Sequence, residues 1–264
     1  MTGAKKSLGQ HFLNSPSALS AIVQVGQIKK EEVILEIGPG RGVLTTALLQ
    51  KSSNVIAIEK DSRLMPFLQE KFNKEITSGQ LTLMSGDIMN FSPTNYSPLT
   101  DHYKLIANIP YYLTGQIFRQ FLETKNQPDK MVLLVQKEVA DRVIARGDKE
   151  SLLSLSVKAY GRPKYIKTVK AGSFNPPPKV DSAILAIENI SRDFFTTCDE
   201  KLFFKLIHLG FAHKRKQLVA NLAGTYKREK VLKILEQIKL SPTIRAEDLK
   251  IEDWKNLTSK IEAD

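Results

Sequence analysis

Cysteine is nearly missing from this chain of 264 residues, which holds only Cys198. A single thiol excludes an internal disulfide framework and a metal cluster built on cysteines, and it favours a reducing, cytoplasmic location. The four histidines show no H-E-x-x-H or similar spacing, so no metal is expected. Long hydrophobic runs are missing too, since no apolar stretch reaches the ~18 residues of a membrane span. We expect a soluble protein without a membrane partner.

Acidic residues are scarce in two windows of the chain. Residues 151–180 hold six basic residues and no acid, and residues 201–230 hold eight basic residues against Glu229 alone. These windows carry +6 and +7 of a net charge of +11. Clustered cations bind phosphates and release counterions, which favours a polyanionic partner such as nucleic acid. A solubilising basic face is the alternative, and charge alone does not separate the two.

The hydrophobic pattern predicts an α/β fold. Five short apolar runs, each typical of a buried strand, alternate with amphipathic segments: VILEIG, NVIAIEK, LTLMSGD, YKLIANI and KMVLLVQ. This alternation indicates βαβ units and a mainly parallel sheet. Ser15 and Pro16 form an N-cap and first-turn pair, so a helix precedes the first strand. Later, YIKTVK and SAILAIENI predict an antiparallel pair of strands joined by a proline-rich turn.

A change of composition predicts a domain boundary near residue 192. From Thr197 onward the pattern is helical, with Thr197 and Glu200 forming a capping box before a helix that Gly224 ends. We therefore predict a larger α/β domain over residues 1–192 and a small, basic, all-α domain over residues 193–264.

Glycine and acidic residues mark the ends of the first three predicted strands. Gly38, Gly40 and Gly42 occupy the turn in EIGPGRGVLT, where glycine permits a tight reversal and a close approach of backbone to a ligand. Glu59 ends the second strand, where a carboxylate accepts hydrogen bonds from both ribose hydroxyls of a nucleoside cofactor. Asp87 ends the third strand, placed either to bind an adenine amino group or to cap a turn.

This pattern serves either NAD or S-adenosylmethionine. The G-x-G-x-x-G of NAD-binding turns would need glycine where this chain has Val43, so the spacing leans away from a pyrophosphate cradle. Three marked strand ends favour a nucleoside lying across the carboxyl edge of the sheet, with a purely structural glycine turn as the alternative.

The fourth strand ends in the polar stretch ANIPYYLT. An adenine N6 amine is a weak nucleophile because its lone pair is delocalised into the ring, so its methylation needs acceptors that orient the amine. The side-chain oxygen of Asn108 and the carbonyl of Ile109 are such acceptors. Pro110 makes the turn rigid, and Tyr111 offers a ring on which a flipped base stacks. An ordinary Asn-x-Pro turn with tyrosines in the core is the alternative.

Seven stretches occur in the order and spacing of the ribosomal RNA adenine N6,N6-dimethyltransferases: GQHFL, EIGPGRGVLT, IEKD, GDIM, NIPYYLT, QKEVADR and FNPPPKVDSAIL. Between about Lys6 and Ile187 the chain most resembles the small-subunit, kasugamycin-sensitivity type. NIPY together with FNPPPKVDS is far more specific than the glycine turn. The resemblance implies a class I S-adenosylmethionine-dependent methyltransferase fold, Rossmann-like, with a mainly parallel sheet, a late antiparallel strand and a small all-α C-terminal domain for RNA.

The same resemblance implies the reaction and its partners. S-adenosylmethionine would be the cofactor, and two adjacent adenines in the 3'-terminal hairpin loop of 16S rRNA would be dimethylated during ribosome biogenesis. The partner would be small-subunit rRNA or the assembling subunit, and we expect a monomer.

Carried over by position, the resemblance also implies roles for individual residues. The cofactor would contact His11, Leu13, Gly38, Gly40, Glu59, Asp87 and Asn108. The target amine would lie against residues 108–111, and Phe174 would stack on the opposite face of the flipped adenine. Without the resemblance, Phe174 would be interpreted as an apolar plug beside the prolines. His11 replaces the asparagine that is usual in this motif, and a histidine can also donate a hydrogen bond.

Two basic clusters are candidates for contacts with RNA phosphates. The first lies at the end of the fifth predicted strand and comprises Lys137, Arg142 and Arg146, for which solvated helical charge is the alternative. The second lies in the basic domain and comprises Lys214, Arg215 and Lys216. Such contacts position the RNA, while sequence is recognised through loop shape and the flipped base.

Three other functions stay open at the level of sequence. Large-subunit rRNA methyltransferases of the erythromycin-resistance type share the glycine turn and NIPY. A ribosome-assembly or RNA-binding factor with reduced activity would have vestigial catalytic residues; the intact Gly38, Glu59 and Asn108 count against it but do not measure turnover. An NAD-dependent dehydrogenase would be stabilised by NAD rather than by S-adenosylmethionine.

Overall fold

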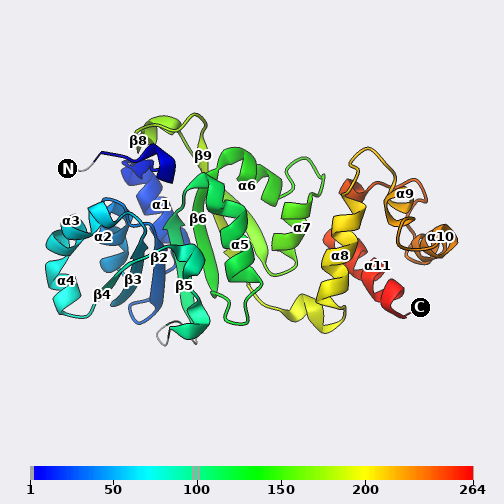
Figure 1. Ribbon diagram of the computed structural model, residues 1–264, viewed down its shortest axis with the longest axis horizontal. Helices are drawn as coiled ribbons and strands as arrows, with labels where there is room; N and C mark the ends of the chain where they lie inside the picture. Colours follow the sequence, from blue (N-terminus) through cyan, green and yellow to red (C-terminus); the bar gives the residue numbers. More distant parts are fainter. Residues whose placement is uncertain (1–2, 97–98, 100–101, 264) are drawn as a thin grey trace. The chain divides into compact units, whose positions relative to one another are not determined.

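The main sheet belongs to the N-terminal part of the chain. A computed structural model describes residues 3–96, 99 and 102–263. Within these residues, seven strands form the sheet in the order β4-β3-β2-β5-β6-β9-β7 (Figure 1). Their bounds are β2 Val33–Ile37, β3 Asn54–Glu59, β4 Leu81–Ser85, β5 Tyr103–Asn108, β6 Lys130–Gln136, β7 Arg162–Val169 and β9 Ser182–Glu188.

Strand directions agree with the predicted fold. Strands β2 to β6 pair in parallel, and β9 pairs antiparallel with β6, from Met131 opposite Ile187 to Gln136 opposite Ser182. The mainly parallel sheet with a late antiparallel strand is therefore confirmed. The strand order reverses between β2 and β5, and such a switch point leaves a crevice at the carboxyl ends of the two strands.

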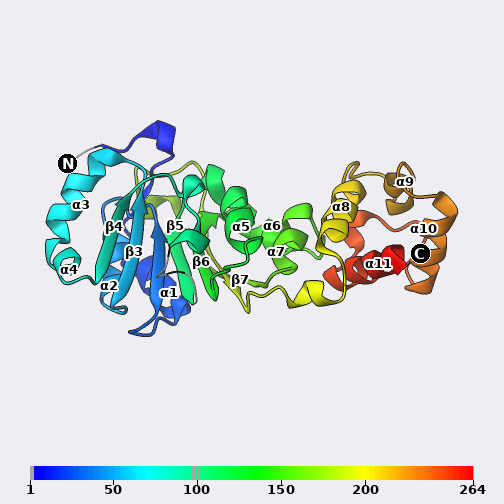
Figure 2. The same cartoon turned by 60° about the horizontal axis from the view of Figure 1, so that its bottom comes forward.

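Helices cover both faces of this sheet (Figure 2). From the switch point, the β2–α2–β3 and β5–α5–β6 connections run in opposite directions, so right-handed crossovers place α2 and α5 on opposite faces. The predicted Ser15 N-cap of α1 is confirmed, because its side chain accepts a hydrogen bond from the Ala18 amide. The helices of this part are α1 Pro16–Gly26, α2 Val43–Leu49, α3 Met65–Lys71, α4 Asn73–Thr77 and α5 Thr114–Leu122. After β6, the chain continues into α6 Lys137–Val143 and α7 Leu152–Lys158.

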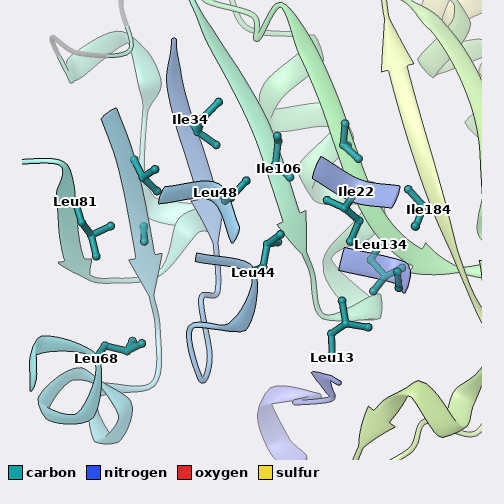
Figure 3. Packing of buried hydrophobic residues seen from close by; sticks show 14 of the residues in the cluster. Leu13, Ile22, Ile34, Leu44, Leu48, Leu68, Leu81, Ile106, Leu134 and Ile184 are labelled. Atoms are coloured by element: carbon teal, nitrogen blue, oxygen red, sulfur yellow. The ribbon is translucent and has the colours of Figure 1, made fainter. Parts of the chain in front are cut away.

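One face of the sheet forms a continuous apolar core with α1 and α2. Ile34, Ile106 and Leu134 come from alternate positions of three strands and pack against Ile22 and Leu48 (Figure 3). Each of these side chains is at most 1 % exposed. This packing fixes the sheet whose carboxyl edge carries the predicted site.

A second, two-stranded sheet was not predicted. Strand β1, Phe12–Leu13, pairs antiparallel with β8, Phe174–Asn175. It ties the N-terminal segment to the loop between β7 and β9. Short 3-10 turns complete this part: η1 Lys6–Leu8, η2 Ser62–Leu64, η3 Ile88–Asn90, η4 Pro93–Asn95, η6 Tyr111–Leu113 and η7 Ala171–Ser173.

The chain divides into two compact units, residues 1–140 with 163–190 and residues 141–162 with 191–264. This differs from the predicted division at residue 192 because residues 141–162 group with the C-terminal helices. Within that unit, the Tyr160 ring packs against Phe195 and Phe204, with centroids 5.2 and 6.1 Å away. The roles predicted for the two parts stay predictions.

The C-terminal unit is helical, but two details of its predicted start are wrong. The N-cap of α8 is Asp199 rather than Thr197, since its carboxylate accepts from the Leu202 amide at 2.7 Å. The helix expected to reach Gly224 ends at Gly210 and resumes at α9, because the Asn221 side chain binds the carbonyls of Gly210 and His213. The elements are η8 Asp193–Thr196, α8 Glu200–Gly210, α9 Leu218–Leu222, α10 Arg228–Gln237, η9 Ala246–Asp248 and α11 Ile251–Ala263.

The described residues contain neither a membrane-spanning helix nor a cluster of metal-ligating side chains. No helix there has both the length and the apolar character needed to cross a membrane. No group of three or more His, Cys, Asp or Glu side chains there is arranged to hold a metal ion.

Candidate active site

A cavity lies at the carboxyl edge of the sheet, at the switch point between β2 and β5. It encloses about 980 Å³, counted out to its open mouth. Its wall consists of residues 8–13, 36–41, 43–44, 58–60, 86–88 and 108–113. All the residues predicted to contact the cofactor therefore meet at one cavity, although they come from five segments of the sequence.

The glycine turn is held from two sides. Gly38, Gly40 and Gly42 have φ angles of +66°, +59° and +72°, which is the left-handed region that glycine adopts without strain. On one side, the Lys71 ammonium of α3 donates to the carbonyls of Arg41 at 2.9 Å and Gly42 at 3.3 Å. On the other, the Arg41 guanidinium lies 4.6 Å from the centre of the Phe12 ring. The turn is thus fixed by α3 and by the N-terminal segment.

Glu59 is a buried carboxylate held in place by backbone amides. Its Oε2 accepts from the Gly40 amide at 2.9 Å and its Oε1 accepts from the Asp61 amide at 2.8 Å, while the residue is 5 % exposed. Burial raises the pKa of the Glu59 carboxyl above its ordinary value, and these amide bonds act in the opposite direction. Each oxygen keeps lone-pair capacity for a further donor, such as a hydroxyl.

Asp87 acts as a turn residue at the rim of the cavity. One carboxylate oxygen accepts from the Met89 amide at 3.0 Å and caps η3, and the other accepts from the Lys60 ammonium at 2.6 Å. The hydrogen bond from Lys60 is the main reason why the pKa of Asp87 is lowered. The turn interpretation is therefore correct, and binding of an adenine amine by the same side chain stays a prediction.

Asn108 is fixed by the N-terminal segment. Its side-chain Nδ2 donates to the backbone carbonyl of His11 at 3.0 Å. That bond aims the Nδ2 end of the amide at residue 11, and no described residue donates to Oδ1. Ile109 follows with a buried side chain, and Pro110, with φ −57°, is the N-cap residue of η6. An acceptor is thereby presented beside the cavity on a rigid strand end.

The Tyr111 ring is anchored at its hydroxyl, which lies 2.6 Å from the Ser182 Oγ. The His11 ring stacks on it, with centroids 5.9 Å apart and planes inclined by 21°. Histidine Nδ1 in turn lies 2.8 Å from the Pro176 carbonyl. Burial raises the pKa of Tyr111, so it remains a neutral phenol. His11 therefore contacts the ring on which a base was expected to stack.

Phe174 is not part of the cavity wall. It is 4 % exposed, belongs to the apolar core and pairs with Leu13 across the small sheet. Here it has the apolar packing role, and its stacking on a flipped adenine stays a prediction. Leu13, by contrast, both joins the core and lines the cavity.

None of the residues predicted to contact RNA is among those that line the cavity. Arg142 is exposed on α6, Lys137 is partly buried at its start, and Arg146 pairs with Asp141 at 2.9 Å. The second cluster lies in the turn between α8 and α9 rather than on a helix. Its members are exposed: Lys214, Arg215 and Lys216.

Several residues of the site were not identified from the sequence. Gln10 donates to the buried Asp61 at 2.9 Å, Lys60 pairs with Asp87, and Lys71 holds the glycine turn. Gln10 and Ser182 lie inside the quoted motifs GQHFL and FNPPPKVDS, so the motifs carried a signal for them. No motif in the sequence marks Lys71, because its partners are backbone carbonyls, which every residue carries.

The strand order, the late antiparallel strand and a cavity at the switch point are those of a class I methyltransferase. The sequence model described as ribosomal RNA adenine dimethylase matches residues 1–263, so the chain belongs to this family.

Curated relatives and solved structures agree with this membership. A ribosomal RNA small subunit methyltransferase A of Dehalococcoides mccartyi is 41% identical over 96% of this chain and 87% of its own length. The protein of the same name from Fusobacterium nucleatum is 36% identical over 98% and 97%. A dimethyladenosine transferase structure from Plasmodium falciparum has a TM-score of 0.82 at 27% identity, covering 96% and 98%. The 23S rRNA methyltransferase ErmE shares the fold, with a TM-score of 0.78 at 22% identity over 95% and 99%.

Proposed function

We propose that the protein uses S-adenosylmethionine to dimethylate the N6 amines of two adjacent adenines in the 3'-terminal hairpin loop of small-subunit rRNA, in the cytoplasm during ribosome biogenesis. Membership of the family and the names of the curated relatives support this proposal. The observation that carries it is Asn108, whose amide is fixed by His11 so that Oδ1 remains an acceptor beside the cavity.

The residues around the cavity fit the cofactor. Glu59 offers buried carboxylate oxygens with spare lone pairs to ribose hydroxyls, and Asp87, which is only partly buried, offers carboxylate lone pairs to an adenine amine. Gly38 leaves its backbone open, because no atom would lie within 4 Å of a Cβ built there. His11, Leu13 and Gly40 also line the cavity. When bound, the cofactor supplies a methyl group on a positively charged sulfur.

The chain's own residues prepare the amine. Asn108 Oδ1 and the Ile109 carbonyl each accept one N6 hydrogen, which draws the nitrogen lone pair out of conjugation and toward the methyl carbon. Held in this way, the nitrogen would accept the methyl group from the sulfonium of the bound cofactor, with the electron pair of the carbon–sulfur bond passing to sulfur. The displaced amine proton then leaves to solvent. In-line attack needs no covalent enzyme intermediate, so the contribution of these residues is to position and polarise the amine.

Replacement of Asn108 tests the proposal. Asn108→Ala should lower methyl transfer from labelled cofactor to undermethylated small subunits by about 10²- to 10³-fold, because one preorganised polar contact is lost. RNA binding should change little. Asn54→Ala is the matched control, since this asparagine lies at the opposite end of the sheet on β3. Unchanged transfer by Asn108→Ala would remove the assigned role.

The substrate and the cofactor are tested with the unmodified protein. Label should enter small-subunit rRNA; label in large-subunit rRNA alone would overturn the substrate assignment. S-adenosylmethionine, and not NAD, should raise the melting temperature, because only a ligand of the native state stabilises it. Stabilisation by NAD alone would favour a dehydrogenase.

A further inference from the structure

Ser182 is a buried hydroxyl that connects two distant motifs. It is the first residue of β9 and is 0 % exposed. Its Oγ lies 2.6 Å from the hydroxyl of Tyr111, which belongs to NIPY and begins η6. Ser182 itself comes from FNPPPKVDS, and 71 positions separate the pair in the sequence.

Ser182 stands on rigid structure. It pairs with Gln136 in the β6–β9 ladder, and Leu134 of β6 pairs in turn with Asn108 of β5. The serine and the asparagine are therefore positioned by the same three-stranded block of the main sheet. Side chains on strands hold their positions more closely than side chains on loops, so the hydroxyl is a fixed anchor.

The anchor limits the motion of the Tyr111 ring. Two side-chain torsions set the direction of a tyrosine ring, and a hydrogen bond at its far end restricts both. The His11 ring lies against one face, at a centroid distance of 5.9 Å. Without the Ser182 contact, this partly exposed ring would lose the hydrogen bond at its far end and keep the stacking against His11.

We propose that Ser182 is a positioning residue for methyl transfer: its hydroxyl fixes the Tyr111 ring, and with it the aromatic surface against which the target base is held beside Asn108. This rests on the proposed adenine methylation. It goes further by giving the serine of the proline-rich motif a function in base positioning rather than in folding alone.

Three variants test the proposal: Ser182→Ala, Tyr111→Phe and the double variant. Either single change removes the same hydrogen bond, so each should lower kcat on undermethylated small subunits by about 10- to 100-fold, as expected for a slightly misplaced reactant. The KM for the cofactor should stay within twofold. The double variant should be no slower than the slower single variant, because both act through one contact.

Matched controls separate positioning from stability. Ser52→Ala removes another buried serine hydroxyl, which donates to Glu32 at 2.7 Å, and Tyr103→Phe removes another buried tyrosine hydroxyl, which donates to Asn126 at 3.1 Å. Both controls lie outside the cavity wall and should keep the parent kcat even if their melting temperatures fall. Tyr111→Phe removes a single oxygen, so it keeps the test valid if Ser182→Ala folds poorly.

A fluorescent base provides a direct readout of stacking. With 2-aminopurine at a target adenine of the hairpin, the parent should quench the fluorescence on binding, and both single variants should quench it less at equal RNA occupancy. Parent-like kcat in Tyr111→Phe, or losses that multiply in the double variant, would overturn the role of Ser182. If the unmodified protein transfers no methyl group to adenine, the proposed function itself fails, which is a different result.

Discussion

Gly38 and Gly42 of the glycine turn share a backbone conformation but differ in surroundings. Gly38 has φ +66° and Gly42 has φ +72°, so alanine at either position would occupy the left-handed region. A Cβ at Gly38 would meet no atom within 4 Å. At Gly42 it would lie 2.4 and 2.6 Å from the Phe72 ring and 3.3 Å from Leu68. The pair therefore separates backbone strain from steric overlap.

The two substitutions should differ in free energy of unfolding. Left-handed strain costs about 1–2 kcal/mol for alanine at either position. Overpacking adds about 1–3 kcal/mol at Gly42 alone, because Phe72 is buried and cannot swing away freely. Gly42→Ala should lose roughly 2–5 kcal/mol and Gly38→Ala about 1–2 kcal/mol, measured by urea unfolding. Adding Phe72→Leu to Gly42→Ala should recover part of the free energy of unfolding that Gly42→Ala loses.

Cofactor affinity should show the reverse order. A methyl group at Gly38 enters the space where the backbone is open to the cavity, so Gly38→Ala should weaken S-adenosylmethionine binding by at least about tenfold in calorimetry. Folded Gly42→Ala should bind more nearly like the parent. Equal stability losses for the two variants, or no rescue by Phe72→Leu, would refute the assignment of the extra cost to Phe72.

Two further predictions concern charge. Burial raises the pKa of Glu36 to about 8, so the native state keeps a proton that the unfolded chain releases near the ordinary value of 4.5. Stability should therefore fall as pH rises between these values, by up to ~1.4 kcal/mol per unit, and Glu36→Gln should flatten this slope in urea unfolding at pH 5 to 8. The basic turn between α8 and α9 comprises Lys214, Arg215 and Lys216. Neutralising these side chains should weaken RNA binding. It should also lower the slope of the logarithm of affinity against the logarithm of salt concentration by about 2–3, one for each lost phosphate contact. The control variant Asn221→Ala keeps every charge and should weaken RNA binding less. If neutralising the turn leaves the salt slope unchanged, the turn is a solvated surface and does not contact RNA phosphates.

The strands and the glycine turn were predictable because their signals are local. Five apolar runs correspond to β2 through β6, and the Ser15 cap follows from two adjacent residues. The glycine turn and Glu59 also followed from position alone, since the carboxyl ends of parallel strands meet at one edge.

The features that were missed depend on contacts between distant residues. Strand β1 exists because Phe12 pairs with Asn175, and no local pattern marks a two-residue strand. Helix α8 ends at Gly210 although its sequence favours continuation. There the Asn221 side chain binds the Gly210 carbonyl, and a Cβ at Gly210 would lie 2.4 Å from the Trp254 ring. Intrinsic helix propensity is a weak prior that such packing overrides.

His11 shows how a departure from a motif can leave a site intact. The acceptor for Asn108 Nδ2 is the backbone carbonyl of residue 11, which any residue type supplies. The orientation of the Asn108 amide is therefore independent of whether histidine or asparagine stands there. The histidine ring acts elsewhere, against Tyr111 and the Pro176 carbonyl. A change at position 11 should thus affect the aromatic surface held by Ser182 before it affects the acceptor oxygen of Asn108.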